Sequence, residues 1–103
     1  MPKPAKTVKT KTLRYDVAEQ LRTPEEMAAY LDAWLTEASD DVSGIARALG
    51  DIARAKGMSQ VARDSGLSRE SLYKALSENG NPSFETVLKV ARAIGVRLHA
   101  GPA

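Results

Sequence analysis

The chain has 103 residues, which is enough for one modest domain and an arm. It has no cysteine and one histidine, which excludes disulfides and thiolate metal sites, argues against a histidine-based zinc or catalytic site, and suits a reducing cytosol. No stretch approaches the roughly 20 apolar residues that a membrane span needs, and the basic start lacks the apolar core of a secretion signal. We therefore expect a cytoplasmic protein without a membrane partner.

Charge is unevenly distributed along the chain, although its sum is only +2. Residues 1–14 carry +5, residues 15–41 carry −7 and residues 42–103 carry +4. This segregation suggests an anionic partner for the C-terminal part and a cationic partner for the middle part. The simpler alternative is that the acidic residues only cover the solvent-facing side of a helix.

The N-terminal end is interpreted as a basic tail followed by a short helix. Residues 1–12 are rich in Pro, Lys and Thr and have too few apolar side chains to offset the entropy of ordering them. Over residues 16–21, Val17 and Leu21 stand four positions apart, which indicates a short first helix.

The second helix is predicted to begin at the sequence TPEE. Thr23 fits the N-cap, Pro24 the first helical position and Glu26 the return bond of a capping box. The helix is expected to end near Glu37, and its apolar stripe consists of Met27, Leu31, Trp34, Leu35 and Ala38. The residues on its outer face are Glu25, Asp32 and Glu37. Trp34 is interpreted as a core anchor, with a place in a partner interface as the alternative.

Two longer helices are predicted on either side of a short central region. The first covers about residues 42–56, with Asp40 or Asp41 as N-cap, Gly57 as its stop and an inner face of Ile45, Leu49, Ile52 and Ala53. The second opens at Pro82 and Ser83, closes at Gly95 and has an apolar face of Phe84, Val87, Leu88, Ala91 and Ile94. Beyond it a short strand or an extended tail is expected.

The central region, residues 58–77, has the pattern of a helix-turn-helix. About two turns from Met58 to Ser65 are followed by Gly66, which can adopt a positive φ and end the helix sharply. Ser68 then caps a second helix, and the inward residues around it are Val61, Ala62, Leu67, Leu72, Ala75 and Leu76. The outward residues are Arg69, Glu70, Tyr73, Lys74 and Ser77. Arg and Lys at this spacing suit a helix placed in the DNA major groove, in a segment that is net positive.

Two family resemblances support this interpretation. Residues 65–96, SGLSRESLYKALSENGNPSFETVLKVARAIGV, resemble the Xre or lambda-repressor-like helix-turn-helix domain, in which NPS-x-E-T-hydrophobic opens the fourth helix. More narrowly, about residues 13–98 resemble the probable addiction-module antidote proteins, which are antitoxins of the host-inhibition-of-growth (HigA-like) type. This likeness includes the upstream YDVAEQLRTPEEMAAYLDAWLTEA. The helix before the turn is about two residues shorter than in common Xre domains.

The resemblance implies an all-α antitoxin of about five helices that binds operator DNA, represses its own operon and neutralises a RelE/HigB-like ribonuclease toxin. By position, the base-reading residues would be Arg69, Glu70, Tyr73 and Lys74. The residues expected to contact the DNA backbone are Ser59, Gln60, Ser68 and Asn79. A homodimer is expected, because one short recognition helix reads too few base pairs to be selective.

We therefore predict three parts: a basic tail (1–14), an acidic helical extension that binds the toxin (15–41) and a helix-turn-helix domain (42–98). The candidate toxin-binding residues are Tyr30, Asp32, Trp34 and Glu37. Neither a cofactor nor enzymatic activity is expected, because adjacent acids such as Asp40 and Asp41 point about 100° apart on a helix and do not converge.

Two alternative functions and two alternative residue roles stay open. The chain could be a stand-alone or phage-type Xre repressor, or an interaction module whose helix-turn-helix no longer contacts DNA. Glu70 could act only on the helix dipole, and the ring of Tyr73 could pack on the preceding helix.

Overall fold

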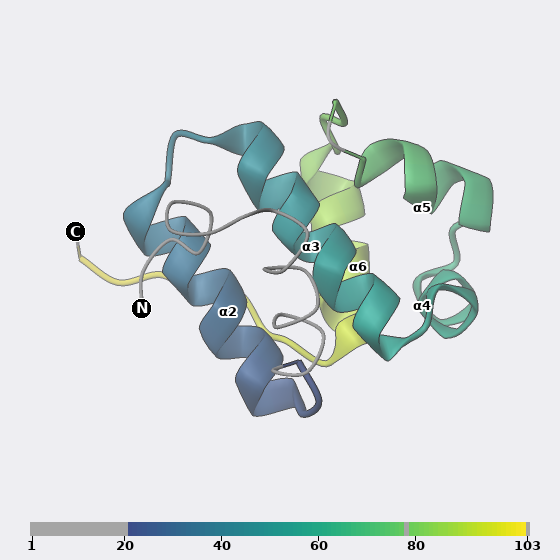
Figure 1. The fold of residues 1–103 in the computed structure, drawn as a ribbon, viewed down its shortest axis with the longest axis horizontal. Coiled ribbons are helices and arrows are strands. Elements are labelled where there is room, and N and C mark those ends of the chain that lie inside the picture. Colours follow the sequence, from purple (N-terminus) through teal and green to yellow (C-terminus); the bar gives the residue numbers. More distant parts are fainter. Residues whose placement is uncertain (1–20, 78, 103) are drawn as a thin grey trace, which may run out of the picture.

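Five helices form the regular structure of the part of the chain that the computed structural model describes, residues 21–77 and 79–102 (Figure 1). They are α2 (Pro24–Glu37), α3 (Val42–Lys56), α4 (Met58–Ser65), α5 (Arg69–Ala75) and α6 (Phe84–Ile94). No strand occurs among these residues, and the segment after α6 is an extended tail. The prediction of an all-α fold with about five helices is confirmed. The predicted basic tail, and the predicted short helix except for Leu21, lie outside the described residues.

The helices begin at polar residues that the sequence identifies. The N-caps of α2, α3, α5 and α6 are Thr23, Asp41, Ser68 and Ser83. At α2 the capping box is complete: the Thr23 hydroxyl accepts the Glu26 N–H at 3.1 Å, and the Glu26 carboxylate accepts the Thr23 N–H at 3.1 Å. Of the two candidates for the α3 cap, Asp41 is the one that bonds, to the Gly44 N–H at 2.8 Å.

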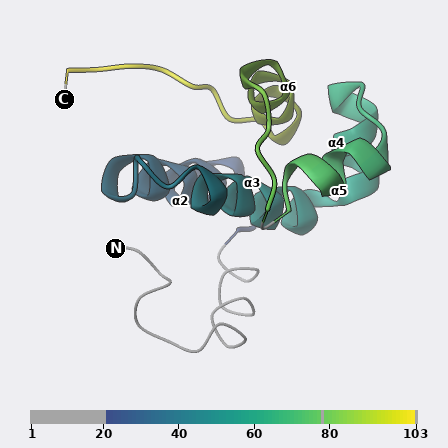
Figure 2. The same cartoon turned by 90° about the horizontal axis from the view of Figure 1, so that it is seen from above.

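Helix α3 is the centre of the fold, because α2, α4 and α6 all pack against it (Figures 1 and 2). Helix α4 in turn contacts α5 and α6. The approach of α3 to the end of α5 requires a glycine: a Cβ at Gly50 would lie 2.9 Å from the Leu76 carbonyl oxygen. The short α4–α5 pair is therefore supported by the longer α3.

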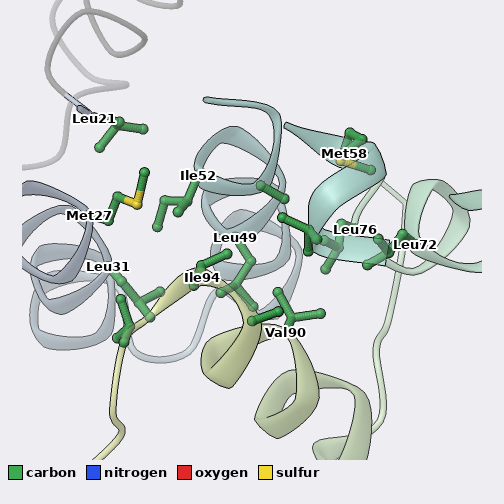
Figure 3. Close-up of a cluster of buried hydrophobic side chains, with 14 of the residues drawn as sticks. Leu21, Met27, Leu31, Leu49, Ile52, Met58, Leu72, Leu76, Val90 and Ile94 are labelled. Carbon is green, nitrogen blue, oxygen red and sulfur yellow. The ribbon is translucent and has the colours of Figure 1, made fainter. Parts of the chain in front are cut away.

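A single cluster of buried apolar side chains joins these helices (Figure 3). Helix α2 contributes Met27 and Leu31, and the other labelled members are Leu21, Leu49, Ile52, Met58, Leu72, Leu76, Val90 and Ile94. Since Leu72 and Leu76 belong to the same cluster as Leu31, helix α2 shares its core with the α4–α5 pair.

The predicted apolar face of α6 is partly wrong. Phe84 is 72% exposed and Leu88 is 39% exposed, whereas Val90 is fully buried. Positions 84, 88 and 90 do not share one direction on a helix of 3.6 residues per turn, and contact with α3 and α4 selects the side that carries Val90 and Ile94. The core therefore covers one edge of the apolar stripe and leaves the other edge in solvent.

The predicted stripe of α2 also extends too far. Leu35, which the spacing assigned to the buried face, is 40% exposed. The buried row is Met27, Leu31 and Trp34, at intervals of four and three residues. Because Leu35 lies about 100° around the helix from Trp34, it leaves this row.

Candidate nucleic-acid interface

The turn between α4 and α5 has the glycine geometry that the sequence predicts. Gly66 has φ +80° and ψ 11°, the left-handed conformation that favours glycine, and its N–H donates to the Ala62 carbonyl at 3.0 Å. The Ser65 hydroxyl adds two bonds: it donates to the Ala62 carbonyl at 3.2 Å and accepts the Leu67 N–H at 3.3 Å. The Ser65 side chain thus closes the turn by hydrogen bonding.

Helix α5 is oriented by a few buried side chains and one cap. Leu72 and Leu76 are buried, and Leu67 and Ala75 pack partly buried against the same cluster. The Ser68 hydroxyl accepts the Ser71 N–H at 3.0 Å and lies 2.9 Å from the Ser71 hydroxyl. With the apolar side fixed in this way, the four proposed base-reading side chains, Arg69, Glu70, Tyr73 and Lys74, are all exposed.

Two of these exposed side chains contact each other along the helix. The centre of the Arg69 guanidinium lies 5.7 Å from the centroid of the Tyr73 ring, and an Arg69 N–H donates to the Tyr73 hydroxyl at 3.3 Å. Cation–π contact of this kind orders an exposed arginine weakly, by about 0.5–1 kcal/mol. Arg69 is thus aligned along α5 and keeps most of its guanidinium donors available.

The four residues predicted to contact the DNA backbone lie at three different places. Ser59 and Gln60 are exposed in the first turn of α4, and Asn79 is exposed in the loop after α5. Ser68 is exposed at the start of α5, where its hydroxyl oxygen already caps the helix. The structure gives no direct contact among these four side chains, so their common role in binding stays a prediction.

Of the four candidate toxin-binding residues, two face solvent and two take part in packing. Asp32 and Glu37 are exposed on α2. Trp34 is 5% exposed, which agrees with its interpretation as a core anchor. The Tyr30 hydroxyl donates to the Asp51 carboxylate on α3 at 3.0 Å. Burial, together with the negative charge of Asp51, raises the pKa of Tyr30 from 10.0 to about 12.

Several apolar residues are exposed although the sequence did not indicate it. Leu35 and Val42, the latter 56% exposed, lie close to the connection between α2 and α3, and Phe84 and Leu88 lie on α6. A helical projection centred on the row Met27, Leu31 and Trp34 would have placed Leu35 outside it, whereas Phe84 and Leu88 give no comparable local signal.

In the described ranges, no helix is long and apolar enough to cross a membrane. Over the same residues, no group of three or more His, Asp or Glu side chains is placed to hold a metal ion.

The comparisons with known proteins concern almost the whole chain. The sequence profile of the family described as "Probable addiction module antidote protein" matches residues 11–102. An uncharacterised protein of Haemophilus influenzae is 55% identical over 84 residues, which are 82% of this chain and 84% of that relative. No solved structure gave a match. Since the profile covers all five described helices, the chain belongs to the probable addiction module antidote protein family.

Proposed function

We propose that the chain is the antitoxin of a type II toxin–antitoxin module, which binds operator DNA to repress its own operon and neutralises a RelE/HigB-like ribonuclease toxin. Membership of the antidote family supports the antitoxin role and implies a toxin partner. The observation that carries the DNA-binding half is the arrangement of α5. Leu72 and Leu76 hold one side of it in the core, while Arg69, Tyr73 and Lys74 face solvent together.

Three exposed side chains of α5 have chemical complements in the major groove. The Arg69 guanidinium can donate two parallel hydrogen bonds to a guanine edge, and Lys74 can bind guanine or a phosphate. Glu70 can accept a hydrogen bond from cytosine. To reach a base, Arg69 has to release the Tyr73 hydroxyl, which is an inexpensive step because that bond is 3.3 Å long and exposed.

Operator recognition requires two copies of the chain. Helix α5 has seven residues, so that only its first turns can contact base edges. A symmetric dimer doubles the number of base pairs read, and places two recognition helices in successive major grooves of a palindromic site, about 34 Å apart.

Toxin neutralisation is assigned to the outer side of α2. Exposed acids on α2 and in the connection that follows are Glu25, Asp32, Glu37, Asp40 and Asp41, and Leu35 is exposed on the same helix. Exposed carboxylates together with an exposed apolar side chain complement the basic surface with which a ribonuclease holds RNA. The antitoxin would then block RNA access by occupying this surface, without any chemical step.

The DNA-binding half is tested by a gel-shift titration of the upstream DNA of the operon against random duplex at ~150 mM salt, where much non-specific phosphate binding is screened. Arg69→Ala is expected to weaken operator binding by ~10- to 100-fold, the value of one bidentate base contact. Arg22→Ala removes the same charge from an exposed residue beside α2 and serves as the matched control. Equal affinity of the wild-type chain for both DNAs would refute this half of the proposal.

The toxin half is tested by co-expression and pull-down with the product of the neighbouring gene. Deletion of α2 is unsuitable, because Met27, Leu31 and Trp34 belong to the core. The double substitution D32K/E37K keeps these residues and is expected to abolish capture, whereas D64K, at an exposed position of α4, should leave it unchanged. Undiminished capture by D32K/E37K would show that the acidic face of α2 is not the toxin surface.

A further inference from the structure

Helix α6 carries an exposed apolar ridge that the core does not use. Phe84 is 72% exposed and Leu88 is 39% exposed. Together with the exposed Arg92 they occupy positions i, i+4 and i+8, which form one continuous row along a helix. Residues on the opposite side of the helix, including Val90 and Ile94, are buried against the remainder of the fold. The ridge therefore faces away from the core.

A hollow lies at the C-terminal end of the same ridge. It has a volume of about 240 Å³ and is lined by Leu88, Ala91, Arg92, Val96, Arg97 and Leu98. The wall formed by the tail is fixed in place, because Val96 is buried and its N–H donates to the Ala91 carbonyl at 2.9 Å. The hollow is thus built by α6 and the first residues of the extended tail. Figure 2 shows this tail running away from the end of α6.

The projecting ring and the hollow are placed symmetrically about Leu88. Phe84 lies four residues before Leu88 and Arg92 four residues after it, each about 6 Å away along the helix axis. When two α6 helices pair antiparallel with a twofold axis at Leu88, Phe84 of one copy lies opposite Arg92 of the other. Long side chains on a helix lean towards its N-terminus, which in an antiparallel pair is the direction of the partner helix's C-terminus. The Phe84 ring is therefore directed past Arg92 of the second copy, to the part of the hollow lined by Val96 and Leu98.

The charges of α6 are complementary under the same symmetry. Glu85 is exposed near the N-terminal end of the helix, whereas Arg92 and Arg97 are exposed at its C-terminal end and in the tail. Antiparallel pairing places Glu85 opposite Ala91 of the second copy, within side-chain reach of Arg92. Within one copy, Glu85 pairs with Lys89 in an exposed i,i+4 contact of 3.1 Å. Both ends of the pair thus bring opposite charges together.

We propose that α6 and the tail bind a second copy of this chain around a twofold axis at Leu88, with Phe84 of each copy inserted in the hollow of the other. A second copy is the occupant that supplies both the ring and the hollow at the required spacing. This inference deepens the proposed function, because operator binding as proposed needs a dimer. The biological role of the interface rests on that proposed function. An interface made by one helix of 11 residues and a short tail is at the low end of specific interfaces, so that we expect a dissociation constant of ~1–100 µM.

The first test measures the monomer–dimer equilibrium of the full chain without DNA or toxin, by sedimentation equilibrium from ~1 to ~300 µM. Phe84→Asp is expected to weaken dimerisation by at least ~30-fold, as for a central anchor of an interface. The matched control is Leu35→Asp, at an exposed leucine of α2, which should dimerise like the wild type. Because Phe84 lies outside the core, the melting temperature of dilute F84D should stay close to that of the wild type.

The second test uses the symmetry of the pairing. E85R and R92E each place like charges at both ends of the interface, so that each variant alone should be monomeric at a concentration where the wild type is dimeric. An equimolar mixture of the two restores both opposite-charge contacts and should form a heterodimer. Loss of the Glu85–Lys89 contact costs the fold little, because exposed i,i+4 pairs contribute about 0.3–0.5 kcal/mol.

The outcomes separate this inference from the proposed function. A wild-type chain that stays monomeric at ~300 µM, or an E85R and R92E mixture that stays monomeric, overturns the interface. In that case the toxin or residues 1–20 of the same chain would be the occupant of the ridge. Specific operator binding by such a chain would leave the proposed function intact. Conversely, a dimer sensitive to F84D with no preference for the operator would support the interface and refute the DNA-binding half.

Discussion

Helix α2 spans 14 residues and buries Met27, Leu31 and Trp34, whereas α5 spans seven residues and buries only Leu72 within its bounds. Both helices present charged side chains to solvent: α2 presents acids, and α5 presents Arg69 and Lys74 among others. The difference lies in how many contacts hold each helix in place.

Helix α2 has several independent attachments to α3. The Tyr30 hydroxyl donates to the Asp51 carboxylate of α3 at 3.0 Å; within α3, Arg54 pairs with the same carboxylate at 3.0 Å. The Arg47 guanidinium lies 5.9 Å from the centroid of the Trp34 ring. Helix α5 is held differently: by its cap, by the buried Leu72 and Leu76, by packing against α4, and by the close approach of Leu76 to Gly50. Leu67 and Ala75 add partly buried packing. The helix that reads DNA in our proposal therefore has fewer buried residues within its bounds than α2.

The strongest way to disrupt α5 is the substitution Leu72→Ala. Leu72 is fully buried, so that its truncation should lower the free energy of unfolding by about 2–5 kcal/mol. The measurement is urea unfolding followed by circular dichroism. Leu88→Ala removes the same atoms from an exposed position, and should change the stability of dilute protein by less than about 0.5 kcal/mol. Equal losses in the two variants would contradict the burial of α5 described above.

The attachment of α2 is tested next by Tyr30→Phe, which removes a hydrogen bond to a charged group and should cost about 1.5–3 kcal/mol at neutral pH. The effect depends on pH. Because the pKa of Tyr30 is raised from 10.0 to about 12, the folded state keeps a proton that the unfolded state loses above pH 10. This stabilisation is complete below pH 10 and is lost as the pH rises towards 12.

The measurement is the difference in unfolding free energy between the wild type and Tyr30→Phe, from pH 8 to pH 11. The difference should be constant up to about pH 10 and then shrink, by at most about 1.4 kcal/mol per pH unit. A difference that stays constant up to pH 11 would mean that burial and Asp51 do not raise the pKa of Tyr30 in the folded protein.

The sequence was most informative where structure is determined within four residues. The capping box of Thr23 and Glu26, the stop at Gly66 and the cap at Ser68 depend on bonds between near neighbours, and all three are found. The Arg69–Tyr73 contact, which spans four residues on one helix, was detectable by the same reasoning but was not anticipated.

The sequence was least informative where distant elements decide. Contact with α3 and α4 decides which face of α6 is buried. The apolar stripe of α6 is wider than the surface that these helices cover, so the stripe alone could not show which of its edges would be buried. Phe84 and Leu88 were therefore placed in the core, although they are exposed. The side chains of the candidate DNA site were predicted to face solvent and do so, because Leu72 and Leu76 define a narrow apolar row on a short helix. Their contacts with DNA stay predictions.

A smaller effect on α5 is expected from Ser68→Ala. The Ser68 hydroxyl accepts the Ser71 N–H at 3.0 Å, and loss of such an N-cap typically costs about 1 kcal/mol. Because α5 has few other supports, the variant should also weaken operator binding by fraying the turn that carries Arg69. Ser43→Ala is the control, since Ser43 is an exposed serine of α3 and the cap of that helix is Asp41. Urea unfolding and gel-shift titration of both variants provide the comparison, and equal behaviour would show that the cap does not limit α5.

The smallest effect concerns the outer side of α5. Tyr73→Phe keeps the ring beneath the Arg69 guanidinium and removes only the exposed hydroxyl that Arg69 contacts at 3.3 Å, so that stability should change by less than about 0.5 kcal/mol. In our proposal Arg69 leaves this hydroxyl when it binds a base. Operator affinity in gel-shift titration should therefore stay the same or rise by up to about twofold, because a competing bond of a few tenths of a kcal/mol is gone. A tenfold fall would instead assign the hydroxyl itself a contact with DNA, since a lost hydrogen bond of about 1.4 kcal/mol has that consequence.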